Sequence, residues 1–229
     1  MQRYKTILFD ADGTLLDFDK AERSALQKVF LAQGFSFDDT VYRTYHKIND
    51  DLWKQFERGE ITKPQLLSTR FATLLKALSL SADPAPFQAL YQQALGEGGF
   101  TIDGARELLE SLAPACRLYL ITNGVSKTQH SRMARSGLRE YFLELFVSED
   151  TGYQKPLREF FDYVARHIPR YDPKTTLVVG DSLSSDIAGG QNAGLDTCWY
   201  NPARAQNTTA LIPTFEIEKL SQLLPIVLG

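Results

Sequence analysis

Apolar residues follow two patterns along this chain, and each pattern predicts a type of secondary structure. Short continuous apolar runs bounded by polar or glycine-containing turns are typical of buried strands in a parallel sheet. They predict strands at 7–9, 118–122, 145–148, 176–180, 197–200 and 214–217. Apolar residues at helical spacing predict helices between and after these strands, at 105–112, 126–136, 158–167, 185–193 and 218–227. Because strands and helices alternate, the sequence predicts an α/β fold, a Rossmann-like and mostly parallel sheet with right-handed crossovers.

The first strand is followed by a long stretch in which only helical patterns occur. Between 17 and 99, apolar stripes predict helices from about 20 to 34, from 38 to 58, from 62 onward and from 84 to 95. Thr62 is a suitable N-cap for the third helix, with Pro64 in its first turn, and Asp83 precedes the fourth. Helices inserted into a strand-and-helix alternation indicate a separate subdomain. We therefore expect a helical insertion at 17–98 and an α/β core formed by 1–16 and 99–229.

Composition and charge narrow the classes of function. The net charge of −3 and the absence of a basic block argue against a nucleic-acid or anionic-membrane partner. No apolar run approaches the roughly 18 residues of a membrane span. The two cysteines are isolated, and the three histidines form no zinc motif. A strand begins within a few residues of the N-terminus, so we expect no signal peptide and a cytoplasmic location.

Polar residues lie where three of the predicted strands end. Asp10 and Asp12 follow the first strand, the sequence Thr122–Gly124 (TNG) ends the second, and Asp181 follows the strand at 176–180. Asp186 lies shortly beyond, and Lys155 precedes a proline in an intervening loop. Each group alone suits an ordinary turn or helix N-cap. Because the carboxyl ends of parallel strands converge on one edge, we expect these groups to lie together.

Together, these residues have the chemistry of a phosphate and metal site. Mg²⁺ takes oxygen ligands, which Asp10, Asp181 and the carbonyl of Asp12 would supply. Thr122 and the amides of Asn123 and Gly124 would donate to phosphoryl oxygens. Lys155 would neutralise the remaining negative charge.

The order of these motifs resembles the haloacid dehalogenase (HAD) superfamily. All four of its motifs occur in sequence, as D-x-D-G-T from Asp10, T-N-G from Thr122, K-P at Lys155 and G-D-S-x-x-x-D ending at Asp186. The stretches 48–62 and 68–71 further resemble a pyrimidine 5′-nucleotidase branch of that superfamily. One departure is that Leu-Arg-Glu follows Lys155-Pro156, where relatives often carry Asp-Pro.

The resemblance implies a Mg²⁺-dependent phosphomonoesterase that forms a phosphoaspartate. Asp10 would be the nucleophile, and Asp12 would protonate the leaving group and then activate water. Thr122 and Lys155 would complete the catalytic set, while Asp186 would hold Lys155 or a metal-bound water. Mn²⁺ or Co²⁺ would also suit the ligands. The implied substrate is a nucleoside 5′-monophosphate, with a preference for pyrimidines.

Three alternatives differ in what they require of the sequence. A dehalogenase of this superfamily lacks the second aspartate, which is present here as Asp12. A phosphatase or phosphomutase acting on small sugar phosphates shares every core motif, so only the cap and a substrate test separate it. A non-catalytic phosphate-binding module is expected to have lost at least one motif residue, and none is lost.

Substrate choice is assigned to the helical insertion, interpreted as a cap over the strand ends. Asn49 and Trp53 lie one helical turn apart, so an amide and an indole would together suit a nucleobase. Phe18, near a hinge at 17–18, would pack against substrate, and Arg70 and Tyr153 are further candidates. A second hinge is expected at 96–99. We expect a small phosphorylated substrate as partner and a monomer or weak homodimer.

Overall fold

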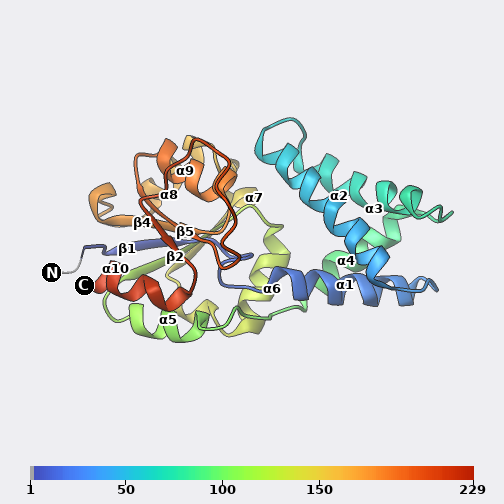
Figure 1. Cartoon of the computed structure of the whole chain (residues 1–229), viewed down its shortest axis with the longest axis horizontal. Coiled ribbons are helices and arrows are strands. Elements are labelled where there is room, and N and C mark those ends of the chain that lie inside the picture. Colours follow the sequence, from blue (N-terminus) through green and yellow to red (C-terminus); the bar gives the residue numbers. More distant parts are fainter. Residues whose placement is uncertain (1–2) are drawn as a thin grey trace. The chain divides into compact units, whose positions relative to one another are not determined.

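The computed structural model describes residues 3–229 and divides the chain into two compact units. The first, here called the α/β unit, comprises Met1–Phe18 and Gly99–Gly229, and the second, the helical unit, comprises Asp19–Gly98. The chain passes from one to the other after Phe18 and returns at Gly99 (Figure 1).

The α/β unit is built on a six-stranded sheet in the order β3-β2-β1-β4-β5-β6. All neighbouring strands pair in parallel, which confirms the predicted fold class. The strands are β1 (Thr6–Phe9), β2 (Arg117–Thr122), β3 (Glu144–Val147), β4 (Thr176–Gly180), β5 (Asp196–Tyr200) and β6 (Phe215–Ile217). Because β1 lies between β2 and β4, its carboxyl end lies beside theirs.

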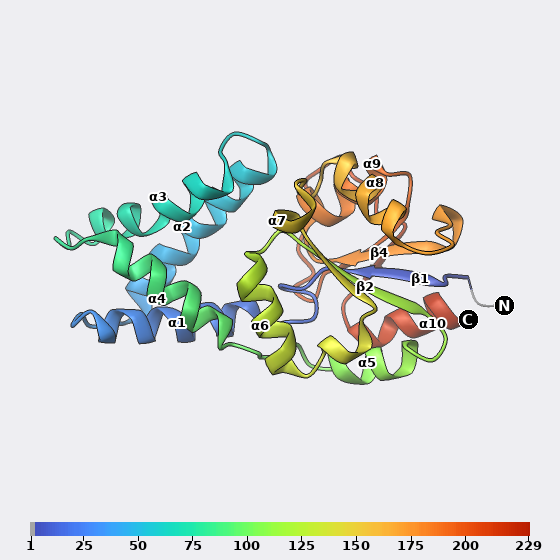
Figure 2. The same ribbon diagram turned by 180° about the vertical axis from the view of Figure 1, so that it is seen from behind.

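Alternate residues of the strands pack on opposite faces of the sheet. Ile7 and Phe9 belong to an apolar cluster with α5 (Ala105–Leu112), α6 (Ser126–Ser136) and α10 (Leu223–Leu228). Leu8 belongs to a cluster with α8 (Arg158–His167) on the other face. The helices α7 (Ser148–Thr151) and α9 (Ala188–Asn192) complete the unit, and Figure 2 shows helices on both sides of the strands.

Two of the predicted helices differ from the structure. The expected terminal helix at 218–227 begins only at Leu223, after a 3-10 turn at Leu220–Gln222. Pro225 explains the difference, because proline is tolerated in the first turn of a helix and not in its interior. The expected helix at 185–193 begins instead as a wider turn at Leu183–Ile187 and continues as α9.

The helical unit consists of α1 (Phe18–Ala32), α2 (Asp39–Glu57), α3 (Lys63–Ala77) and α4 (Pro84–Gly96). The predicted start of α3 is confirmed, since Thr62 and Gln65 form a reciprocal capping box and proline lies in the first turn. Asp83 caps α4 by accepting a hydrogen bond from the backbone N–H of Ala85. These caps satisfy N–H groups that a helix start leaves without partners.

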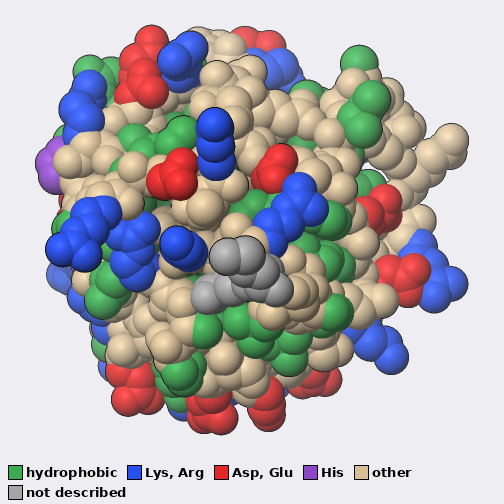
Figure 3. Space-filling model, turned by 90° about the vertical axis from the view of Figure 1, so that its left-hand side faces the viewer, with side chains coloured by type: hydrophobic (Ala, Val, Ile, Leu, Met, Phe, Trp, Pro, Cys, Tyr) green, Lys and Arg blue, Asp and Glu red, His purple; other side chains and the backbone are tan. Residues whose placement is uncertain are grey.

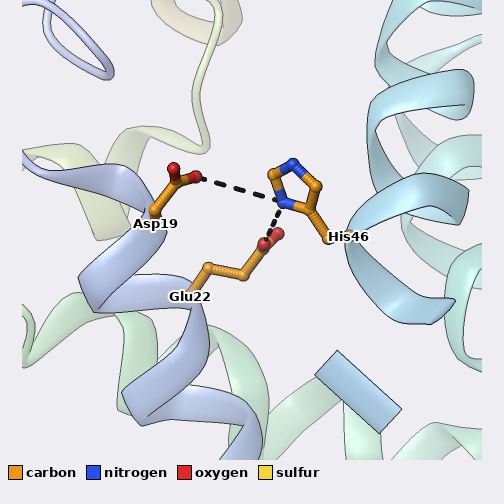
Figure 4. A group of neighbouring side chains, drawn as sticks. All are labelled: Asp19, Glu22 and His46. Carbon is orange, nitrogen blue, oxygen red and sulfur yellow. Dashed lines mark hydrogen bonds and ion pairs between the residues drawn. The ribbon is translucent and has the colours of Figure 1, made fainter. Parts of the chain in front are cut away.

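A buried polar network connects the four helices of this unit. Glu22 of α1 is completely buried, and its carboxylate accepts hydrogen bonds from His46 Nδ1 at 2.7 Å and Asn49 Nδ2 at 3.0 Å. Arg70 of α3 donates to Asn49 Oδ1 at 3.2 Å and to Gln88 Oε1 of α4 at 2.8 Å. Figure 4 shows His46 of α2 facing the carboxylate of Glu22. A buried carboxylate needs such partners because desolvation alone penalises its charge.

We predict that replacing His46 by glutamine weakens the fold most at mildly acidic pH. The hydrogen bond to Glu22 raises the pKa of His46 above 6.5, and burial raises the pKa of Glu22. Because the folded state holds the His46 proton more tightly, this stabilisation is complete below pH 6.5 and is lost as the pH rises through the folded pKa. The expected loss below pH 6.5 is about 0.5 kcal/mol, since the imidazole is partly exposed to solvent.

The measurement is denaturant unfolding of the wild type and His46→Gln across this pH range. His130→Gln, in the α/β unit, is the matched control. A wild-type advantage that does not change with pH would contradict the assignment.

Candidate active site

The loop after β1 brings the first carboxylates to the edge of the sheet. The backbone N–H of Asp10 donates to Val179 O of β4 at 2.9 Å, so the nucleophile candidate is still held by the sheet. Gly13 has a φ of +81°, and a Cβ there would lie 2.4 Å from Asp181 Oδ2, so this turn requires glycine. The Thr14 hydroxyl lies 3.4 Å from Asp10 Oδ2 and 3.2 Å from Asp181 Oδ1.

Lys155 connects the ends of β1, β2 and β4. Its buried ammonium donates to Asp10 Oδ1 at 2.6 Å, to Asp186 Oδ1 at 2.7 Å and to Ile121 O at 3.1 Å. These three acceptors use the full donor capacity of an ammonium group. The backbone N–H of Lys155 donates to Asn123 Oδ1, and Asn123 Nδ2 donates to Lys155 O, both at 2.9 Å. Asn123 therefore fixes the loop that carries the lysine.

The carboxylates at this edge carry more negative charge than Lys155 neutralises. Oxygen atoms of Asp10, Asp181 and Asp186 all lie within 4.8 Å of one another. Burial, with repulsion from Asp186, raises the pKa of Asp181 to about 7. Burial also raises the pKa of Asp10, although Lys155 opposes that effect. Burial by itself lowers the pKa of Lys155, but attraction from Asp10 and Asp186 outweighs it and raises that pKa.

This donor set fits a hard divalent cation. Three carboxylates and one ammonium leave two negative charges, which one divalent ion would balance. Asp186 is already fixed by Lys155 and by the backbone N–H of Ser182, which donates to its Oδ2 at 3.1 Å. Asp10 and Asp181 are consequently the side chains that would hold the ion.

The end of β2 and the start of α6 form a second polar group. The Thr122 hydroxyl accepts hydrogen bonds from the Gly124 N–H at 3.0 Å and from Gln129 Nε2 at 2.8 Å. Gln129 Nε2 also lies 2.7 Å from Asp12 Oδ2, and Arg132 Nη1 donates to Asp12 Oδ1. Asp12 therefore meets α6 through both of its carboxylate oxygens.

Three of these residues were not among the candidates from the sequence, namely Thr14, Gln129 and Arg132. Thr14 is the last residue of the D-x-D-G-T motif, so the motif itself carried the signal. Gln129 and Arg132 are three residues apart on a predicted helix and so share a face, but nothing in the sequence shows that this face meets Asp12.

The remaining candidates lie in different parts of the chain. Phe18 lies beside Arg132, with 5.7 Å between the centroid of its ring and the guanidinium carbon. Tyr153 is exposed to solvent. Asn49 is buried, with both ends of its amide bonded to Glu22 and Arg70, and Trp53 packs edge-on against Phe56. These last residues belong to the helical unit, and substrate contact by any of the candidates stays a prediction.

Comparisons with known proteins agree with the motifs. The sequence model of the haloacid dehalogenase-like hydrolase family matches residues 4–194. The chain is 47% identical to the HAD-hydrolase YfnB of Bacillus subtilis, over 99% of this chain and 97% of YfnB. It is 41% identical to the pyrimidine 5′-nucleotidase PynA of Streptococcus pneumoniae, over 96% and 94% of the two chains. It is 35% identical to the pyrimidine 5′-nucleotidase YjjG of Escherichia coli, over 96% of each.

The crystal structure of YfnB bound to magnesium superposes on this chain with a TM-score of 0.95, at 46% identity and covering 100% of both chains. Fold and family match together identify a hydrolytic enzyme. The chain belongs to the haloacid dehalogenase-like hydrolase family, as its motifs indicated.

Among residues 3–229, no helix is both long and apolar enough to span a membrane. The face of the molecule shown in Figure 3 carries both basic and acidic side chains, with hydrophobic ones between them.

We predict that Asp181→Asn stabilises the metal-free protein and removes its response to Mg²⁺. The pKa of Asp181 is raised from 3.8 to about 7 in the folded protein, so the folded protein loses stability as the pH rises through this range. Above it, asparagine at this position removes a negative charge that repels Asp186. With a chelator at pH 8, the free energy of unfolding should rise by about 1–2 kcal/mol.

Thermal unfolding with and without Mg²⁺ measures both effects, and Asp103→Asn, which replaces an exposed carboxylate, is the control. A variant that is less stable without metal, or that still gains Tm with Mg²⁺ as the wild type does, would show that Asp181 has another role.

Proposed function

We propose that this protein is a Mg²⁺-dependent phosphatase that hydrolyses nucleoside 5′-monophosphates, preferably pyrimidine ones, through a phosphoaspartate on Asp10. The observation that carries the proposal is the juxtaposition of Asp10, Lys155 and Asp181 at one edge of the sheet. In this proposal Asp10 is the nucleophile, Lys155 is a fixed cation and Asp181 is a metal ligand. The magnesium in the YfnB structure and the names of PynA and YjjG support the metal and the substrate class.

In the first chemical step, a carboxylate oxygen of Asp10 forms a bond to phosphorus as the bond to the ester oxygen breaks. Asp12 gives its proton to the departing alkoxide, so the nucleoside leaves as a neutral alcohol. Lys155 and the hydroxyl of Thr122 stabilise charge on the phosphoryl oxygens. Mg²⁺, which Asp10 and Asp181 would hold, would neutralise part of the negative charge of the carboxylate and of the phosphoryl group.

In the second step, water attacks the phosphorus of the phosphoaspartate. Asp12, now ionised, takes a proton from this water, and the bond between phosphorus and the Asp10 oxygen breaks. Orthophosphate is released, Asp10 is regenerated as a carboxylate and Asp12 again holds a proton.

The helical unit, inserted between Phe18 and Gly99, is proposed to act as a cap that excludes water and admits small substrates. The predicted contacts of Phe18, Asn49 and Trp53 belong to this proposal. A phosphatase or phosphomutase acting on sugar phosphates would use the same core residues and is the alternative that a substrate panel must test. The cytoplasmic location and the monomeric or weakly dimeric state remain predictions.

We predict metal-dependent phosphate release that favours UMP, dUMP and dTMP over AMP, GMP and sugar phosphates. Asp10→Asn should reduce kcat by at least about 1,000-fold, because an amide cannot form the acyl phosphate. The measurement is phosphate release from each substrate with Mg²⁺ or with a chelator, and Asp103→Asn is the control.

If the enzyme prefers sugar phosphates, the proposed mechanism still holds, but the proposed nucleotidase activity is wrong. If the folded protein releases phosphate from none of these substrates with Mg²⁺ present, the proposed phosphatase activity is wrong and a phosphate-binding module is favoured.

A further inference from the structure

Gln129 and Arg132 form a polar pair on α6 that no part of the mechanism above uses. Both side chains are buried, with exposed fractions of 1% and 0%. They lie one helical turn apart, and Arg132 Nη1 is 3.3 Å from Gln129 Oε1. Burying a guanidinium and an amide is costly unless their hydrogen bonds are made, so their partners indicate why they are there.

The amide of Gln129 is held in one orientation. Its Nε2 group lies 2.7 Å from Asp12 Oδ2 and 2.8 Å from Thr122 Oγ1, so its two N–H bonds have one acceptor each. Its Oε1 faces the guanidinium of Arg132, which only donates. Rotating the amide by half a turn would put oxygen against the Asp12 carboxylate and nitrogen against Arg132.

The contact with Gln129 also determines what the hydroxyl of Thr122 can do. A hydroxyl has two lone pairs and one hydrogen to donate. The lone pairs of Thr122 accept from Gln129 Nε2 and from the Gly124 N–H at 3.0 Å. Its hydrogen must therefore be donated to a third group, as contact with a phosphoryl oxygen requires.

Asp12 is fixed from both sides by the same pair. Arg132 donates to Oδ1 and Gln129 to Oδ2, which sets the plane of the carboxyl group. A carboxylate offers roughly four lone-pair positions, so these two contacts leave room for a substrate oxygen or water.

The close approach of Gln129 also requires a small residue at Gly124. A Cβ at Gly124 would lie 2.6 Å from Gln129 Cγ, inside any normal contact. The glycine of the T-N-G motif therefore leaves space for the side chain of Gln129, in addition to donating its N–H group to Thr122.

We propose that Gln129 and Arg132 are positioning residues, which orient Asp12 toward the leaving group and Thr122 as a donor to the phosphoryl group. This inference rests on the proposed function, because it assigns Asp12 as the acid. Arg132 contacts Asp12 directly and reaches Thr122 only through Gln129, whereas Gln129 contacts both Asp12 and Thr122. Replacing Arg132 should therefore affect mainly the acid, and replacing Gln129 should affect both functions.

The test compares substrates whose leaving groups differ in their need for a proton. UMP releases an alkoxide and depends on an acid, whereas 2,4-dinitrophenyl phosphate releases a stable anion and does not. The quantity to measure is kcat/KM, which includes steps only up to loss of the leaving group. The variants are Arg132→Met, Arg132→Lys and Gln129→Leu, and Arg135→Met, an exposed arginine on the same helix, is the control.

We expect Arg132→Met to lower kcat/KM about 100-fold for UMP and less than about fivefold for 2,4-dinitrophenyl phosphate. Arg132→Lys should restore part of the loss, since an ammonium also pairs with Asp12. Gln129→Leu should lower kcat/KM for both substrates, and more for UMP. If Arg132→Met does not fold, as judged by thermal unfolding, the other two variants carry the test.

Equal losses for the two substrates in the folded Arg132 variants would overturn the inference, because a merely structural role affects both alike. Unchanged kinetics in every variant would overturn it as well. A wild-type enzyme that hydrolyses neither substrate would instead reject the proposed function, so the two failures are distinguishable.

Discussion

The ion-pair contacts of Lys155 with Asp10 and Asp186 are the interaction on which the rest of the site depends. The ammonium is buried, and its 2.6 and 2.7 Å contacts connect strand ends that are far apart in sequence. Buried ion pairs are poor sources of stability, because desolvation consumes much of their attraction. Their value here is chemical. Burial raises the pKa of Asp10 and the positive charge of Lys155 opposes that effect, so the lysine favours the ionised carboxylate that the proposed attack on phosphorus requires.

The motif Thr122–Gly124 supports that interaction in addition to its proposed contact with phosphate. The side chain of Asn123 bonds to both backbone polar groups of Lys155, so the end of β2 fixes the position of the lysine. Gly124 leaves space for Gln129, which in turn meets Asp12. The proposed nucleophile, Asp10, and the proposed acid, Asp12, are thus held by different residues, the first by Lys155 in a loop and the second by α6.

The sequence was sufficient to predict elements whose signals are local. The run at Thr176–Gly180 is a strand, and Thr62 begins a helix as its capping pattern indicated. The terminal helix begins later than its apolar spacing predicts, because Pro225 is tolerated in the first turn of a helix and not in its interior. Arg132 could not be connected with Asp12, because the two are 120 positions apart and their contact depends on how α6 packs. The convergence of strand ends was predictable, whereas the partners of each side chain were not.

The measurement that tests the central claim most directly is mass spectrometry of acid-quenched Asp12→Asn enzyme after mixing with 2,4-dinitrophenyl phosphate and Mg²⁺. The leaving group of this donor needs no acid, so the phosphoaspartate should still form. The variant lacks the base that activates water, so the phosphoaspartate should then accumulate. We predict one added phosphoryl group, located on the peptide that contains Asp10 and absent when Asp10 is also replaced by asparagine. Phosphate release by the wild type with no adduct under any quench time, or an adduct on another residue, would contradict it.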